Sequence, residues 1–116
     1  MDFKGDINWI RAYQILNMVS DLIKKVEADF RAVKLYFNSE FDIDYYKKLF
    51  NKYKFKVKPE YTDIINILVY HENNIFYFQT RIKADDNWRD FKIKFTKEQI
   101  KDILFKLYYD GAIAEA

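Results

Sequence analysis

The chain has 116 residues, of which 50% are apolar and 33% charged, and a formal net charge of +2; this excludes a disordered chain and a bulk polycation and predicts one domain spanning residues 1–116. It contains no cysteine, which excludes a disulfide framework, a thiol nucleophile and a thiolate metal site. No apolar run approaches the ~20 residues of a membrane span and the first residues lack a signal pattern, so we expect a cytoplasmic protein with no membrane partner.

The first predicted element is a long helix over residues 6–37. Apolar residues recur there at the i, i+3, i+4 spacing of an amphipathic helix, and no glycine or proline interrupts them. An unbroken helix would be about 48 Å long at 1.5 Å per residue, which is long for a domain of this size, so we expect a break near Ser20 and Asp21. Residues 30–37 are also rich in strand-forming side chains and leave a strand as the alternative, although the periodicity favours a helix.

A second helix is predicted to start at Asp42, whose side chain can cap it, and to be followed by a lysine-rich strand. The apolar spacing changes from a helical to an alternating period near Asn51, a residue type that can adopt the left-handed conformation that ends helices. In a strand over residues 51–59, alternate side chains point to opposite faces. The lysines would then form one row, made up of Lys52, Lys54, Lys56 and Lys58.

Three further strands and a last helix are predicted after Pro59. The strands cover Tyr61–Tyr70, Ile75–Lys83 and Asp90–Phe95, with turns between them. Thr96 and Gln99 have the spacing of a capping box, and Gly111 is placed to end the helix that follows. We expect residues 111–116 to form a flexible tail. The order predicts a two-layer α+β domain, with N-terminal helices, a three- to four-stranded antiparallel sheet and a C-terminal helix.

The sequence contains few residues that could carry out catalysis. The chain has one histidine, His71, in a predicted turn, and its two glycines stand at opposite ends, so neither a hydrolytic triad nor a phosphate-binding loop is indicated. We therefore expect no enzyme activity, no cofactor and no metal. A remote alternative is a Mg²⁺-dependent nuclease, since Asp85 and Asp86 precede the acid-x-Lys triplet of Asp90 and Lys92, the kind of pattern that such nucleases place on strands.

The strongest charge feature is a basic segment at residues 47–58. It carries six lysines and no acid, so the remaining residues sum to −4. Lysines in such a row protect the edge of a sheet from pairing with other chains, or they bind an acidic partner. Aromatic residues make up 20% of the chain, more than a core of this size can hide, which indicates an exposed contact surface.

These observations predict a small non-enzymatic binding protein, such as a regulator, an immunity protein or a phage-type inhibitor, that occupies a surface of a protein or nucleoprotein partner. A two-fold homodimer is a further expectation. Nucleic-acid binding is the alternative, because residues 43–110 resemble double-stranded-RNA-binding domains in the order helix, three strands, helix, although they lack that family's glycine-containing approach and its lysine cluster at the final helix. The predicted partner-binding residues are Lys47, Lys48, Lys52, Lys54, Lys56, Lys58, Tyr45, Tyr53 and Trp88.

Overall fold

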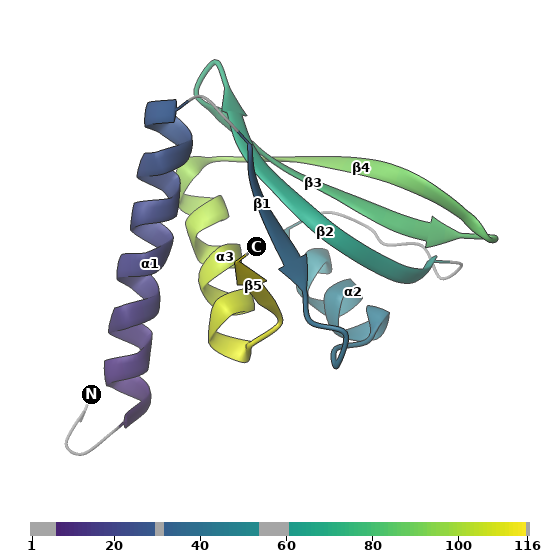
Figure 1. The fold of residues 1–116 in the computed structure, drawn as a ribbon, viewed down its shortest axis with the longest axis horizontal. Coiled ribbons are helices and arrows are strands. Elements are labelled where there is room, and N and C mark those ends of the chain that lie inside the picture. The colour runs from purple at the N-terminus through teal and green to yellow at the C-terminus, as the bar shows by residue number, and fades with distance from the viewer. Residues whose placement is uncertain (1–6, 30–31, 54–60, 116) are drawn as a thin grey trace.

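The computed structural model describes residues 7–29, 32–53 and 61–115 (Figure 1). Helices and strands alternate irregularly along the chain, which is the pattern of an α+β fold. In order, the elements are α1 (Ile7–Asp29), β1 (Val33–Phe37), α2 (Ile43–Asn51), β2 (Tyr61–Glu72), β3 (Ile75–Ala84), β4 (Asn87–Phe95), α3 (Lys97–Asp110) and β5 (Ile113–Glu115).

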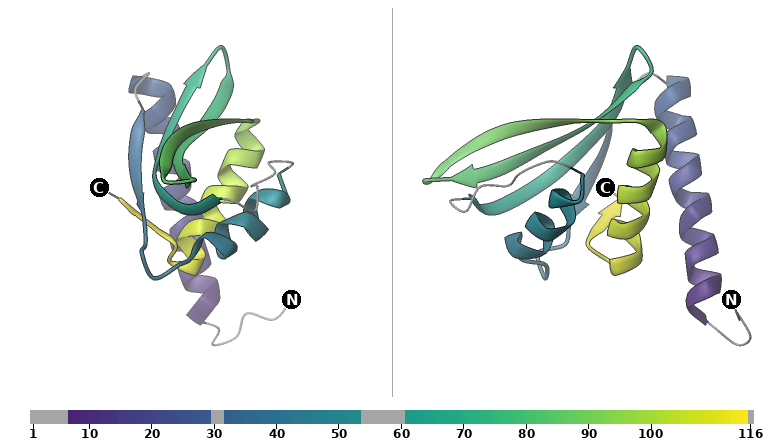
Figure 2. Two further views of the ribbon diagram at one scale, coloured as in Figure 1. Left: turned by 90° about the vertical axis from the view of Figure 1, so that its right-hand side faces the viewer. Right: turned by 180° about the vertical axis from the view of Figure 1, so that it is seen from behind.

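The strands form one antiparallel sheet in the order β4-β3-β2-β1-β5. The predicted fold class is confirmed, with the short strand β5 added at the edge beside β1. In the views of Figure 2, α2 and α3 lie on the same side of the curved sheet, and α1 lies beside α3 (Figure 1). Two contacts at opposite ends show that α1 and α3 run antiparallel, because Glu27 pairs with Lys97 at 2.9 Å and the Arg11 guanidinium lies 5.0 Å from the centre of the Tyr109 ring.

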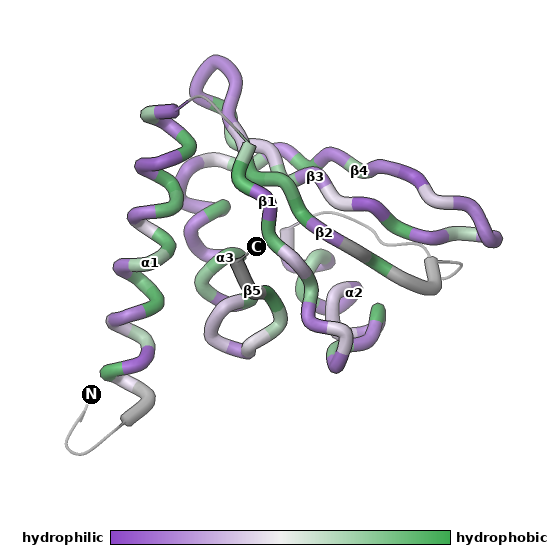
Figure 3. The backbone as a smooth tube through the Cα atoms, in the orientation of Figure 1, coloured by the Kyte–Doolittle hydropathy of each residue, from purple (hydrophilic) through white to green (hydrophobic). Residues whose placement is uncertain are grey.

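One face of the sheet builds the core with the helices. Alternation of apolar and polar side chains assigns each strand residue to a face, and it is visible along β3 and β4 in Figure 3. On the core face, Phe78 is fully buried and its ring meets the edges of Phe50 from α2 and Phe95 from β4. The other strand residues buried on this face include Leu35, Ile64, Ile67, Val69, Phe76, Ile82 and Ile93.

The prediction of a helix over residues 6–37 was wrong at its end. Helix α1 stops at Asp29, and Val33–Phe37 is the strand β1, where buried Leu35 stands between exposed Lys34 and Tyr36. Pairing with β2 and β5 gives this β-branched and aromatic segment hydrogen bonds and side-chain contacts on both sides. These tertiary interactions stabilise a strand more than the local periodicity stabilises a helix. The break expected near Ser20 and Asp21 was also wrong, since α1 is one unbroken helix of 23 residues.

Both hairpins have two-residue turns, so the strands run further than predicted. Asn73 and Asn74 connect β2 to β3, and Asp85 and Asp86 connect β3 to β4, all four with positive φ between 50° and 65°. Turns of this kind match the twist of the strands, and asparagine and aspartate tolerate the left-handed conformation better than most residues. His71 consequently belongs to β2 and not to a turn.

Asn66 is the one polar residue in the apolar run Ile64–Tyr70, within the strand predicted over Tyr61–Tyr70, and the structure explains its presence. The register between β2 and β3 shifts between Ile65 and Ile67, and Asn66 has a φ of 36° at this bulge. The buried Thr80 hydroxyl donates to the Asn66 carbonyl at 3.1 Å. The bulge lets Ile64 and Ile67 both face the core, although they lie three residues apart.

The C-terminal helix forms as predicted. Thr96 and Gln99 form a reciprocal capping box, and Gly111 ends the helix with a φ of 77°. The flexible tail expected for residues 111–116 was wrong, because β5 pairs with β1 and both Ala112 and Ile113 are buried. The Ala112 carbonyl accepts hydrogen bonds from the backbone N–H of Asn38 at 2.7 Å and from the Tyr46 hydroxyl at 3.1 Å. These two bonds fix the segment to the end of β1 and to α2.

Candidate functional site

The predicted lysine strand begins as a helix. Lys47 and Lys48 lie in α2, and Lys52 is its C-terminal cap with a right-handed φ of −64°, so neither Lys52 nor Asn51 adopts the conformation expected of it. The buried face of α2 continues through Phe50, and this packing carries the helix past the point where the sequence period changes. Lys54, Lys56 and Lys58 lie outside the described residues.

One lysine of α2 lies close to a carboxylate of the same helix. The Lys47 ammonium is 3.8 Å from Asp44 on the same helix. A further carboxylate lies at Asp42, the cap of α2. On α3, Asp110 accepts a hydrogen bond from Tyr45 of α2, and Asp102 accepts one from Tyr53, which follows α2. Carboxylates around α2 therefore offset part of the positive charge of Lys47, Lys48 and Lys52, the described lysines of the basic segment.

Tyr45 and Tyr53 join α2 to α3. The Tyr45 hydroxyl donates to Asp110 at 2.6 Å, and the Tyr53 hydroxyl donates to Asp102 at 2.9 Å, while the Tyr53 ring packs edge-on against Phe95. Burial and the bond to Asp102 raise the pKa of Tyr53 to about 12, and burial together with Asp110 raises the pKa of Tyr45 further. Both side chains hold the helices together, which is a structural role that the sequence pattern did not indicate.

We expect the protein to lose stability between pH 10 and pH 12, in part through Tyr53. A tyrosine in the unfolded chain has a pKa of about 10. The stability that Tyr53 contributes through its raised pKa is therefore fully present below pH 10, and it is lost as the pH rises through the pKa of Tyr53 in the folded protein. Tyr53→Phe should lower the free energy of unfolding by about 1 kcal/mol at pH 7, because it removes one hydrogen bond. Above pH 10 the stability of this variant should fall less steeply than that of the wild type. Urea denaturation at pH 7, 10 and 11.5 measures this. Exposed Tyr36 supplies the control Tyr36→Phe, and parallel pH profiles of Tyr53→Phe and the wild type would contradict the assignment.

Trp88 lies apart from α2. It is 42% exposed in β4, and its pairing partner Lys83 places an ammonium 6.0 Å from the centre of the ring. Alternation assigns Trp88 to the sheet face opposite the one that α2 covers through Phe50. The structure thus separates the predicted contact residues into an α2 group and Trp88.

The face that carries Trp88 is the strongest candidate site, and we call it the open sheet face. Its residues follow from the strand register, since directly paired residues of antiparallel strands share a face. In the described part of the chain these residues point away from the core helices. They are Lys34, Tyr36, Leu68, Tyr70, Glu72, Ile75, Tyr77, Gln79, Arg81, Lys83, Trp88, Asp90, Lys92 and Lys94.

Cations and aromatic rings alternate across the open sheet face. The Lys34 ammonium lies 5.3 Å from the centre of the Tyr36 ring, and the Lys92 ammonium lies 5.3 Å from the centre of Tyr70 and 4.6 Å from that of Tyr77. Tyr70 and Tyr77 are themselves stacked at 5.3 Å. Among the side chains that the structure describes on this face, five cations stand against the carboxylates of Glu72 and Asp90, an excess of positive charge that the net charge of the chain conceals.

The acid-x-Lys triplet also lies on this face. The Asp90 carboxylate pairs with Arg81 at 2.8 Å, which lowers the pKa of Asp90, and Lys92 lies over the two tyrosines. Within residues 7–29, 32–53 and 61–115, no three His, Asp or Glu side chains gather as metal ligands would. The described side chains therefore place Asp90 in an ion pair with Arg81 and place Lys92 among aromatic rings.

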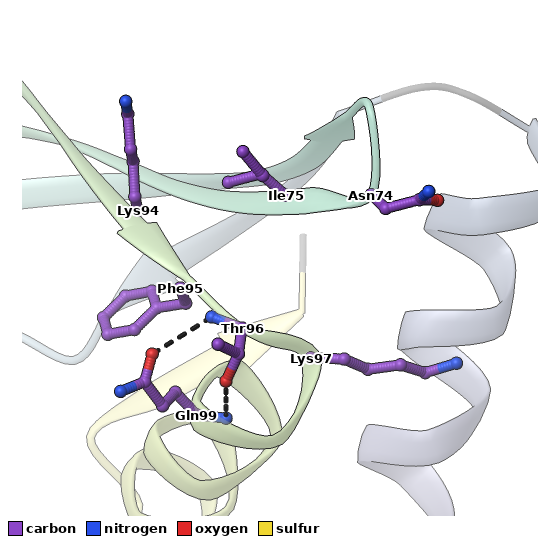
Figure 4. Close-up of a pocket in the computed structure, with 7 residues that line it drawn as sticks. All are labelled: Asn74, Ile75, Lys94, Phe95, Thr96, Lys97 and Gln99. Atoms are coloured by element: carbon purple, nitrogen blue, oxygen red, sulfur yellow. Dashed lines mark hydrogen bonds between the residues drawn. The ribbon is translucent and has the colours of Figure 1, made fainter.

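One pocket of about 350 Å³ opens where β4 leads into α3 (Figure 4). Three of the polar residues around it have partners, because Thr96 and Gln99 bond each other in the capping box and Lys97 reaches across to Glu27 of α1. These contacts stabilise the start of α3. Its lining residues are Asn74, Ile75, Lys94, Phe95, Thr96, Lys97 and Gln99.

The basic residues of the open sheet face were missed because they are spread over three strands, β1, β3 and β4. Arg81 and Lys83 alternate along β3, and Lys92 and Lys94 alternate along β4, each as a short pair that is ordinary in isolation. Only the pairing of β3 with β4 brings the two pairs together. Alternation of Lys with apolar residues at 91–95 was the one available signal.

Comparison with known protein families, with curated proteins and with solved structures gives no match for this chain. Among the helices of the described ranges, none has an apolar stretch long enough to cross a membrane.

Proposed function

We propose that this protein is a non-enzymatic binding protein and that the open sheet face contacts an acidic macromolecular partner. The observation that supports the proposal is the alternation of cations with aromatic rings on one exposed face. The lysines of α2 support it less, because Lys47 pairs with Asp44 and the other side of α2 is held by acidic residues of α3.

Single-stranded nucleic acid is the partner that this surface fits best. Its recognition combines cations that follow the phosphates with aromatic rings on which bases stack. Tyr36 and Trp88 are 44% and 42% exposed, and each has a lysine beside its ring, so both kinds of contact are offered at the same place. The sheet presents these groups on one continuous face that an extended strand can cross.

An acidic protein surface is the second candidate. Tyr77 is only 9% exposed and Tyr70 is half-buried, so on these two strands the rings contribute an edge and not a stacking platform. Tyrosine, tryptophan and arginine are the residues most enriched at the energetic centres of protein interfaces. In that case electrostatics would mainly set the association rate and the choice of partner.

A titration with single-stranded oligonucleotides tests the first candidate. In Trp9→Phe, Trp88 is the remaining tryptophan, so its fluorescence reports on this face alone. We expect oligo(dT) and oligo(U) to quench it, and expect the affinity to fall roughly 20-fold between 50 and 200 mM salt for three phosphate contacts. Absence of binding to single strands at 20 mM salt would overturn nucleic-acid recognition, and binding of an acidic polypeptide such as polyglutamate under the same conditions would favour the protein partner.

A further inference from the structure

The first half of α1 exposes a stripe of large apolar side chains. Trp9, Tyr13 and Leu16 lie within a third of the helix circumference at 100° per residue, and Ile10 borders them. Their exposed fractions are 45%, 59%, 52% and 52% respectively, which makes them four of the most exposed large hydrophobic residues of the described chain. The Trp9 and Tyr13 rings are stacked at 6.2 Å. We call these four residues the α1 stripe.

The charge pattern of α1 sets this half apart. Residues 7–20 include one charged side chain, Arg11, which is directed to the Tyr109 ring of α3, whereas residues 21–29 include five. A helix half that faces water throughout would be expected to share the 33% charged content of the chain. The neutral flanks of the stripe are Gln14 and Asn17, which offer hydrogen-bonding groups without charge.

We propose that the α1 stripe is the interface of a two-fold homodimer, in which α1 packs antiparallel against α1 of a second copy. A two-fold axis brings each patch against itself, so a patch of one charge would repel its copy and a neutral patch would not. With the axis at Tyr13, Trp9 of one copy lies near Leu16 of the other. The N-terminal end of α1 extends past the C-terminal end of α3 (Figure 1).

The area is sufficient for such a pair. An aromatic side chain carries roughly 150–250 Å², so the half-exposed stripe offers roughly 350–400 Å² of apolar surface per copy. Two copies with their polar flanks then bury about 1,000 Å², which is the lower end of specific interfaces. A dimer would also place two open sheet faces in one particle. The inference does not rest on the proposed function of that face.

Sedimentation equilibrium tests the dimer. We expect the wild type to move from 14.2 kDa toward twice that mass as its concentration rises from 1 to 300 µM, and expect Leu16→Glu to remain monomeric with an unchanged circular dichroism spectrum. Lys24→Glu, an exposed position in the charged half of α1, is the matched control and should dimerise like the wild type. A monomer at every concentration overturns the proposal, as does a dimer that Leu16→Glu leaves intact.

Cysteine cross-linking locates the axis independently, because the chain has no native cysteine. Under mild oxidation Tyr13→Cys should form a disulfide-linked dimer at least tenfold faster than Lys24→Cys. Equal rates for the two variants would place the contact elsewhere and overturn the proposal.

Discussion

Phe78→Ala should lower the free energy of unfolding by about 3–5 kcal/mol, which is the usual cost of truncating a buried aromatic side chain. Phe78 is fully buried at the centre of the sheet, and its ring contacts Phe50 and Phe95 edge-on at 5.5 and 6.2 Å between centroids. One substitution therefore removes contacts that join α2, β3 and β4. Since small domains have a total stability of about 5–15 kcal/mol, much of the population should unfold under mild denaturant.

The neighbouring residue supplies the control for Phe78. Gln79 lies one position along β3, so its side chain points to the open sheet face. Gln79→Ala should lower the unfolding free energy by no more than about 1 kcal/mol, because it removes the hydrogen bond that Gln79 accepts from the Tyr70 hydroxyl at 3.2 Å. Urea denaturation of both variants, followed by circular dichroism, makes the comparison. Similar losses for the two would contradict the assignment of the sheet faces.

Removal of residues 112–116 should lower the free energy of unfolding by about 2.5–6 kcal/mol, although the sequence predicts a tail there. The deletion exposes the site of buried Ile113, worth about 1.5–3 kcal/mol. It also takes away the Ala112 carbonyl and leaves the buried Tyr46 hydroxyl without that acceptor, worth about 1–3 kcal/mol.

Point substitutions separate the two contributions of the C-terminal segment. Ile113→Val should cost about 1 kcal/mol and Tyr46→Phe a similar amount, each measured by urea denaturation. The deletion should exceed both. If a protein lacking residues 112–116 were as stable as the full chain, the segment would be the loose tail that its composition predicts.

Local signals that end elements were readable in the sequence because each is complete within a few residues. Asp42 caps α2, the Thr96–Gln99 box starts α3 and Gly111 ends it, as predicted. Elements that depend on distant partners were not readable. The β1 segment at 33–37 has the spacing of a helix but pairs with residues more than thirty positions away, and β5 exists only because β1 offers an edge.

In the candidate site, too, residues marked by a local signal were predicted and residues brought together by strand pairing were not. Trp88 was predicted to contact a partner because it follows Asp85 and Asp86 in an acidic turn, a signal within a local window, and the structure places it on the open sheet face. The lysines of β3 and β4 were not identified, because their proximity depends on the register between strands. Tyr45 and Tyr53 were assigned to a contact surface, while the structure directs both hydroxyls to carboxylates of α3 that lie 65 and 49 residues further along the chain.

Two triple substitutions compare the lysines of the sheet with the lysines of α2. Lys83, Lys92 and Lys94→Gln neutralises the open sheet face, and Lys47, Lys48 and Lys52→Gln neutralises the described part of the basic segment. Both proteins carry the same net charge, so any difference between them comes from position. The measurement is the affinity for a single-stranded oligonucleotide at 50 mM salt, with Trp88 fluorescence in the Trp9→Phe background. We expect at least a tenfold loss for the sheet triple and less than a threefold loss for the α2 triple. Equal losses, or a larger loss for the α2 triple, would contradict binding on the open sheet face.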